Sequence, residues 1–252
     1  MQLAYDRRGA GPSLILLHSL GADHHVWDPI ADRVAAERDL IALDLPGFGE
    51  SPTLVHDGPP TPVALATAVA GFLDGLELAD GYHVAGNSLG GWIALELAAA
   101  GHAKSVTALA PAGLWPEPLR PKQGFARALA RSASPLLPAL MRSGAARRAV
   151  LAGTAADGAR VPPDAAIRLI RGYATAPGFA AVNAAMRSGR FQSLDRIRVP
   201  VTLVWSDHDR LVAPPAHLPR EVRSVQLADA GHVPMWDAPE RVAELLLEGS
   251  SR

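Results

Sequence analysis

Ser88 stands between two glycines in the stretch Gly86-Asn87-Ser88-Leu89-Gly90. A short β-prone run precedes this stretch and a helix-forming segment follows it, so the pattern predicts a sharp turn between a strand and a helix. Glycines two positions either side of the serine leave room for the close backbone approach of such a turn. The turn lifts a serine hydroxyl off the end of a sheet, as in the G-x-S-x-G nucleophile elbow. A glycine-rich turn without any chemistry has the same short pattern, so its surroundings in the chain decide between the two interpretations.

A serine hydroxyl becomes an effective nucleophile when an imidazole removes its proton, and the imidazole needs a carboxylate that fixes its tautomer. Asp209 follows a strand-like run that ends at Trp205, and His232 follows a second run that ends near Leu227. Parallel sheets place reacting groups just beyond the carboxyl ends of their strands. The chain order serine, acid, histidine is also the order found in hydrolases built on the elbow.

The elements that must position these residues follow a regular alternation. Short β-rich runs alternate with longer alanine-rich helical segments, which predicts an α/β fold with a mostly parallel, twisted sheet and flanking helices. The expected strands are residues 14–17, 40–43, 82–85, 105–108, 201–205 and 225–228. One helix is expected after Thr61, with Pro62 at its first position, and a second helix runs from the elbow to Gly101.

The alternation stops between residues 115 and 196, where helical pieces rich in alanine, leucine and arginine are separated by prolines. We interpret this segment as a helical cap inserted into a core domain made of residues 1–114 and 197–252. Ordinary surface helices that complete the domain are the alternative. Five apolar side chains suggest either a roof over a mainly apolar pocket or a core that binds the cap to the domain: Leu136, Leu137, Leu140, Met141 and Leu151.

The composition narrows the class of partner. The chain of 252 residues has 24 basic and 25 acidic side chains and no cysteine, which excludes disulfides and thiolate metal sites. The near-neutral net charge favours a small-molecule partner over nucleic acid or a membrane. The first residues have no apolar signal core and no apolar run is long enough to span a bilayer, so a cytoplasmic location is expected. Neither a cofactor nor a metal is expected, and the oligomeric state stays open.

Taken together, these motifs resemble the α/β-hydrolase superfamily in its serine-nucleophile branch. The resemblance rests on His18-Ser19-Leu20-Gly21, residues 44–51 (DLPGFGES), residues 86–91, Asp209 and Gly231-His232. It implies Ser88 as nucleophile, His232 as general base and then acid, and Asp209 as the orienting carboxylate. Asp207 is the competing acid, but Asp209 fits the family spacing better because it stands four residues after the tryptophan that ends the expected strand.

Acyl transfer also needs hydrogen-bond donors aimed at the developing oxyanion. The Leu89 N–H, at the amino end of the elbow helix, is the first expected donor. By resemblance, the second is the Leu20 N–H. The family has glycine where this chain has Ser19. Either the position accepts any small residue, or the serine adds a hydroxyl near the pocket.

The substrate class stays open between related reactions. A small, mainly apolar ester is the first expectation. The Gly86-Asn87-Ser88 sequence and Trp236 are similar to carbon–carbon bond hydrolases of vinylogous diketone acids, whereas Ser19-Leu20-Gly21 with Trp27-Asp28 resembles enol-lactone hydrolases. The candidate substrate-binding residues are therefore Ser19, Trp236 and, because both families bind carboxylates, an arginine anchor, Arg171 or Arg168.

A serine at the elbow argues against the dehalogenase and epoxide-hydrolase branches. A cofactor-free perhydrolase and, in another functional class, a non-catalytic small-molecule binder on the same fold are the remaining alternatives.

Overall fold

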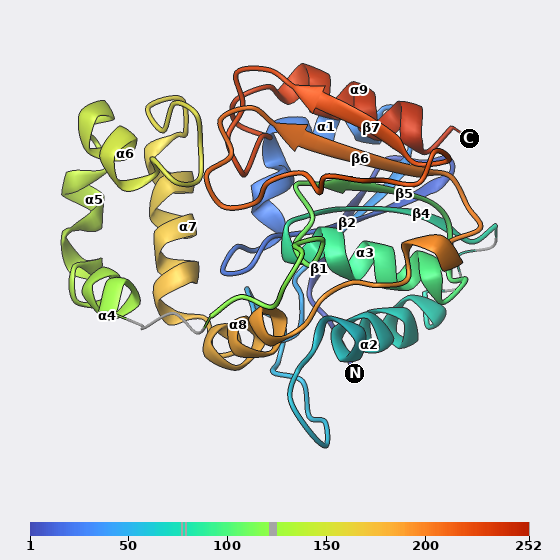
Figure 1. Cartoon of the computed structure of the whole chain (residues 1–252). Helices are drawn as coiled ribbons and strands as arrows, with labels where there is room; N and C mark the ends of the chain where they lie inside the picture. Colours follow the sequence, from blue (N-terminus) through green and yellow to red (C-terminus); the bar gives the residue numbers. More distant parts are fainter. Residues whose placement is uncertain (77, 79, 121–124, 252) are drawn as a thin grey trace.

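The computed structural model describes residues 1–76, 78, 80–120 and 125–251, and a seven-stranded sheet lies at its centre (Figure 1). The strand order is β1-β3-β2-β4-β5-β6-β7. The strands are β1 (Tyr5–Arg8), β2 (Ser13–Leu17), β3 (Asp39–Leu43), β4 (Tyr82–Asn87), β5 (Ala103–Leu109), β6 (Val201–Ser206) and β7 (Arg223–Leu227). The β1–β3 pair is antiparallel and the other five neighbouring pairs are parallel. The α/β class expected from the sequence is confirmed.

All six strands expected from the sequence are present, and the edge strand β1 is an addition. Its sequence, Tyr-Asp-Arg-Arg, is polar, and its residues alternate between exposed and half-buried. An edge strand has only one neighbouring strand and can keep charged side chains in water. Hydrophobic patterning therefore gave no indication of β1.

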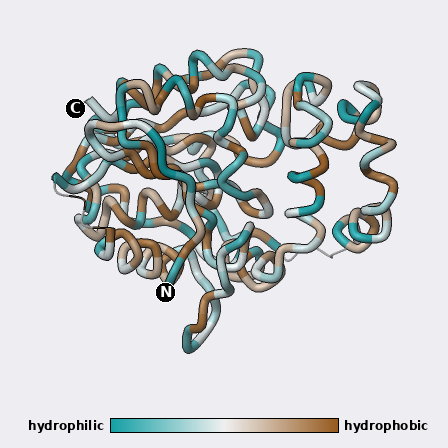
Figure 2. Tube along the Cα trace, turned by 180° about the vertical axis from the view of Figure 1, so that it is seen from behind, coloured by the Kyte–Doolittle hydropathy of each residue, from teal (hydrophilic) through white to brown (hydrophobic). Residues whose placement is uncertain are grey.

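The two faces of the sheet have separate hydrophobic cores, because successive side chains of a strand point to opposite faces. In β2, Ile15 and Leu17 belong to one core, while Leu14 and Leu16 belong to the other. The first core is covered by α2 (Pro62–Asp74), α3 (Leu89–Ala99) and α8 (Phe179–Ser188), and the second by α1 (Asp28–Ala35) and α9 (Pro239–Gly249), with η1 (His24–Trp27) leading into α1. Figure 2 shows hydrophobic stretches running through the interior of the molecule, in helices as well as in extended segments.

The two helices expected on either side of β4 are present with their expected ends. The Ala64 N–H donates to Thr61 Oγ1 at 3.2 Å, so Thr61 caps α2 and Pro62 occupies its first position. Helix α3 begins directly after Ser88, and Gly101 follows its end with a positive φ of 82°. None of the helices in the described ranges is long and apolar enough to cross a membrane.

The segment of residues 115–196, called the helical insertion below, lies between β5 and β6. Its elements are α4 (Phe125–Ser132), η2 (Ser134–Leu136), α5 (Leu137–Leu140), α6 (Gly144–Val150), α7 (Pro163–Thr175), α8 and η3 (Leu194–Arg196). Figure 1 shows α4–α7 to one side of the sheet, with α7 between the sheet and the outer helices α4–α6.

The helical insertion has a small hydrophobic core of its own. Three of the five residues expected to roof a pocket fill this core: Leu137, Met141 and Leu151. The other two, Leu136 and Leu140, are exposed to solvent. The expected roof is therefore wrong for Leu136 and Leu140, because periodicity alone does not tell which side of a short helix meets a neighbour.

Candidate active site

The turn at Ser88 has the backbone geometry of an elbow. Ser88 itself has a φ of 55°, a conformation that costs a non-glycine residue on the order of 1–3 kcal/mol. A Cβ added to Gly86 would lie 2.2 Å from the Gly90 oxygen, and one added to Gly90 would lie 2.1 Å from the Leu17 oxygen. Only glycine fits at both positions, since the first turn of α3 packs directly against Gly86 at the end of β4 and against the end of β2.

His232 and Asp209 form a buried pair beyond the carboxyl ends of β7 and β6. His232 Nδ1 and Asp209 Oδ2 are 2.7 Å apart, and the two side chains are only 6% and 2% exposed. The Leu211 and Val212 N–H groups donate to Asp209 Oδ1. Burial disfavours the charged form of Asp209 and would raise its pKa. The hydrogen bond and electrostatic attraction of His232, together with the two amide hydrogen bonds, outweigh this effect of burial. The pKa of the carboxyl therefore lies below its usual value.

Asp207, the competing acid, has different partners. It is exposed, and its carboxylate accepts the N–H groups of Asp229 and Ala230. The structure therefore brings His232 to Asp209, while Asp207 closes the loop after β7.

Asn87 links the elbow to the loop that carries His232. Its side-chain amide donates to the His232 carbonyl at 2.9 Å and to the Leu109 carbonyl at 3.1 Å. Since Asn87 is the residue directly before Ser88, these two bonds fix the histidine loop and the end of β5 beside the elbow. Ser88, Asp209 and His232 thus follow three parallel strands at the same edge of the sheet.

The two amides expected to bind an oxyanion lie on segments that touch. Leu89 is the first residue of α3, where an N–H has no partner within the helix. Leu20 is the second residue of a turn closed by the Ala22 N–H and the Ser19 carbonyl at 3.1 Å, with Gly21 at a φ of 82°. A Cβ on Gly90 would also lie 2.6 Å from the His18 oxygen, so the start of α3 abuts this turn.

His18, fully buried beside this turn, holds it in place as a neutral ring. The Leu45 N–H donates to His18 Nε2 at 2.9 Å, so the ring proton is on Nδ1, which donates to the Ser19 carbonyl at 2.8 Å. Burial lowers the pKa of His18, which agrees with an uncharged imidazole. The sequence motif contained His18, but only the structure showed that its ring joins the turn at Ser19 to the Leu45 backbone.

Asp44 organises the next loop around a buried carboxylate. Its Oδ1 accepts the N–H and the Nδ1–H of His24, at 2.7 and 2.8 Å, and its Oδ2 accepts the Glu50 N–H. Burial opposes the charge of Asp44, yet these bonds hold the pKa of Asp44 below its usual value. The same contact with Asp44 raises the pKa of the half-buried His24.

This pair predicts a pH window for stability. The lowered pKa of Asp44 stabilises the fold above about pH 4 and is lost in acid, whereas the raised pKa of His24 stabilises it below about pH 6.5 and is lost as the pH rises further. We expect His24→Asn, which keeps a neutral donor near Nδ1, to lower the urea midpoint most near pH 5–6. Urea unfolding of both proteins from pH 4.5 to 9 measures this difference, which should shrink above pH 7. A difference that grows toward pH 9 would contradict the charged pair.

Asp237, which the sequence analysis missed, joins the histidine loop to the helical insertion. Its buried carboxylate accepts the N–H groups of Gly231, at 2.9 Å, and Ala156, at 2.8 Å, through Oδ2, and that of Asp157, at 3.2 Å, through Oδ1. Gly231 directly precedes His232. Residues 156 and 157 are about 80 positions away in the chain, so no local spacing in the sequence indicates this contact.

The expected substrate-binding residues do not all gather in one place. Ser19 is buried in the turn beside Leu20. Trp236 is half-buried and lines a hollow of about 70 Å³, which Arg168 also lines. Arg171 is exposed on α7 and does not line this hollow. Of the two arginines considered as an anion anchor, Arg168 is therefore the one beside Trp236.

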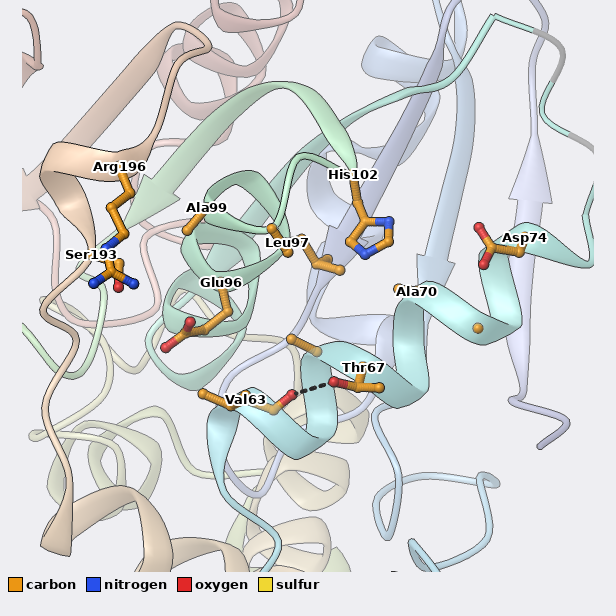
Figure 3. A pocket seen from close by; sticks show the side chains of 13 residues that line it. Val63, Thr67, Ala70, Asp74, Glu96, Leu97, Ala99, His102, Ser193 and Arg196 are labelled. Atoms are coloured by element: carbon orange, nitrogen blue, oxygen red, sulfur yellow. Dashed lines mark hydrogen bonds between the residues drawn. The ribbon is translucent and has the colours of Figure 1, made fainter.

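A larger hollow of about 440 Å³ lies away from these residues, between α2, α3 and the end of the helical insertion (Figure 3). Glu96 lines it, accepts the Trp92 Nε1–H at 2.8 Å, and has a pKa raised by burial. Ser88 lines neither hollow and is only 7% exposed.

Comparison with known proteins agrees with this architecture. A 32% identical relative, the epoxide hydrolase EphH of Mycobacterium tuberculosis, aligns over 65% of this chain and 83% of its own. A pimeloyl-[acyl-carrier protein] methyl ester esterase of Neisseria meningitidis is also 32% identical, over 91% of this chain and 90% of its own.

Solved structures match over nearly the whole chain. A membrane phospholipase A described as a bacterial virulence factor is 27% identical with a TM-score of 0.76, covering 99% of this chain and 83% of that one. The enol-lactonase of Burkholderia xenovorans, at 23% identity, covers 99% of this chain and 96% of that one with a TM-score of 0.74. The CarC serine hydrolase of carbazole degradation, at 22%, covers 99% and 94% with a TM-score of 0.73, and these two show a shared fold. Residues 14–245 match the model of the alpha/beta hydrolase family, and the chain belongs to that family.

Proposed function

We propose that this alpha/beta hydrolase is a serine esterase that cleaves a small, mainly apolar ester through an acyl-enzyme. The observation that carries the proposal is the buried 2.7 Å contact between His232 and Asp209 at the sheet edge that also presents Ser88. A strained serine, a carboxylate-bound imidazole and two backbone amides on adjoining segments are parts that acyl transfer requires.

In the first half of the reaction, Ser88 Oγ attacks the ester carbonyl while His232 Nε2 takes the hydroxyl proton. The carbonyl oxygen becomes an oxyanion, to which the Leu20 and Leu89 N–H groups donate. His232 then gives the proton to the leaving alcohol as the bond between carbonyl carbon and alcohol oxygen breaks. Asp209 holds His232 in the tautomer that leaves Nε2 free to accept, and it stabilises the imidazolium.

In the second half, His232 removes a proton from water, and the resulting hydroxide attacks the acyl-enzyme. The bond between Ser88 Oγ and the acyl carbon breaks, and His232 returns the proton to Ser88. The products are a carboxylic acid and an alcohol, and the enzyme is restored without a cofactor or metal.

We further propose that the helical insertion acts as the cap over this site, within a core formed by residues 1–114 and 197–252. A Cβ added to Gly172 of α7 would lie 2.5 Å from the Gly21 oxygen, and one added to Gly231 would lie 2.6 Å from the Ala155 carbonyl carbon. The insertion thus touches both the turn of Leu20 and the loop of His232. Its position predicts that it selects the substrate, with Trp236 and Arg168 at the seam.

The names of the relatives bear on the choice of substrate and reaction. An ester substrate agrees with the name of the Neisseria relative, and the enol-lactonase supports a cyclic ester as an alternative. EphH is named an epoxide hydrolase, but epoxide hydrolysis through an alkyl-enzyme uses an elbow carboxylate. With Ser88 at that position, this chain favours acyl transfer. The cytoplasmic location expected from the sequence stays a prediction.

A serine-directed fluorophosphonate probe tests the proposal. We expect the wild-type protein to be labelled, Ser88→Ala to be unlabelled, and Ser206→Ala, a matched change at the end of β6, to be labelled normally. In-gel fluorescence with peptide mapping reads the outcome, and circular dichroism confirms folding. Folded wild-type protein that takes no label would support the non-catalytic binder instead. Rates on acyl esters of graded length, an enol-lactone and a ring-cleavage dienoate then rank the substrate classes.

A further inference from the structure

The near-neutral charge of the whole chain conceals a strong segregation. The helical insertion, residues 115–196, contains 13 Lys and Arg against four Asp and Glu, a net charge of +9. The rest of the chain contains 11 Lys and Arg against 21 Asp and Glu, a net charge of −10. The molecule therefore has one strongly basic part and one strongly acidic part.

The outer part of the insertion carries basic side chains without acidic ones. From residue 118 to residue 156 there are seven Lys and Arg and no carboxylate side chain. Within α4–α6, Arg127 and Arg147 donate to backbone carbonyls and so serve the fold. Arg131 and Arg142 are exposed, which leaves their charge available to a partner.

Large aliphatic side chains are exposed among these arginines. Four of the nine most exposed large hydrophobic residues in the described ranges belong to η2 and α4–α6: Leu129 (60%), Leu136 (67%), Leu140 (45%) and Val150 (48%). Their neighbours Leu137 and Met141 fill the core that the insertion shares with α7. The exposed residues lie outside that core. We call Leu129, Arg131, Leu136, Leu140, Arg142 and Val150 the outer face.

We infer that the outer face docks the protein on an anionic lipid surface. Arginines and aliphatic side chains without any carboxylate are the composition of helices that lie in the plane of a membrane interface. A surface of negatively charged headgroups attracts the +9 insertion and repels the −10 remainder, so attraction and repulsion together turn the insertion toward the lipid.

The exposure of separate aliphatic side chains among arginines favours lipid over a protein partner. Protein interfaces depend on a few side chains that fill well-packed pockets, and neither hollow described above is lined by α4–α6. Acyl chains, in contrast, accept leucines that protrude one by one. Docking of this kind is peripheral and does not depend on the proposed esterase activity.

Vesicle co-sedimentation of the full-length Ser88→Ala variant tests the inference, since this variant would leave ester lipids intact. We expect binding to phosphatidylcholine vesicles that contain phosphatidylglycerol, weak binding to phosphatidylcholine alone, and release by high salt. Arg131→Glu with Arg142→Glu should lower the partition coefficient on the order of tenfold or more, because each basic residue near the surface contributes about 1 kcal/mol. Leu136→Ser with Leu140→Ser should weaken binding without changing its salt dependence.

The matched control is Arg33→Glu with Arg220→Glu. It makes the same charge change at exposed positions outside the helical insertion, and it should keep the partition coefficient within about twofold of the starting protein. Absence of binding to anionic vesicles at low salt, or equal loss of binding in the control, overturns the inference.

Two other occupants of the outer face would give different results. Salt-sensitive dimers without lipid, removed by the outer-face variants, would assign the face to a second copy of the chain. Retention on polyglutamate beads without vesicle binding would assign it to an acidic protein.

Discussion

Replacing Asp209 by asparagine is expected to lower kcat by about 10⁴-fold. The Asp209 carboxylate accepts the His232 Nδ1–H at 2.7 Å and two backbone N–H groups on its other oxygen. Asparagine has one acceptor and one donor group. If its oxygen keeps the two backbone amides, its NH₂ group faces His232 and forces the ring proton onto Nε2. A ring with that tautomer cannot accept the proton of Ser88, so the loss falls on kcat.

Asp207→Asn is the matched control for this prediction. Asp207 is two residues away, is exposed and has no bond to His232, so its variant should keep kcat within a few-fold of wild type. Steady-state kinetics on a p-nitrophenyl ester, with the urea midpoint of each variant, separate catalysis from folding. Loss of activity in Asp207→Asn with normal activity in Asp209→Asn would assign the acid to the wrong residue.

Features with strong local constraints could be predicted from the sequence. At the elbow, the spacing of Gly86, Ser88 and Gly90 indicates a strand-to-helix turn because any Cβ at the two glycines collides with backbone. The buried parallel strands could be predicted from their continuous apolar runs, and α2 from the Thr61-Pro62 cap. Each of these features depends on residues within a few positions of one another.

Features that depend on distant contacts could not be predicted in the same way. Strand β1 is polar and exists because it pairs with β3 at the edge. Leu136 has the same apolar character as Leu137, yet only Leu137 meets α7, so periodicity in such a short helix did not distinguish them. Asp237 resembled an ordinary loop aspartate until the insertion brought the Ala156 and Asp157 amides to it. Similarly, a whole-chain charge of −1 gave no indication that basic and acidic residues occupy different parts of the molecule.

Asp237→Ala is expected to lower the free energy of unfolding by about 2–3 kcal/mol, since the buried Gly231 amide that loses its acceptor costs about 1–3 kcal/mol and the part-buried Ala156 and Asp157 amides, which water can reach, cost less. Gly231, Ala156 and Asp157 all lose their acceptor in this variant. Asp237→Asn should lose less, because an amide oxygen in the position of Oδ2 still accepts the two shorter bonds. Urea unfolding measures the series, with Asp195→Ala, an exposed aspartate of the insertion, as the control.

Catalysis distinguishes a positioning role for Asp237 from a purely structural one. Because Gly231 directly precedes His232, release of its amide should displace the imidazole and lower kcat at a temperature where the variant remains folded. A residue that only fastened the insertion would alter KM through the covering of the site and leave kcat unchanged. In Asp237→Asn the Gly231 bond persists while the Asp157 bond is lost. Relative to Asp237→Ala, kcat should therefore return closer to the wild-type value than the free energy of unfolding does. Equal recovery of both, or a change confined to KM, would show that the carboxylate acts on the insertion alone and that Asn87 suffices to hold the histidine loop.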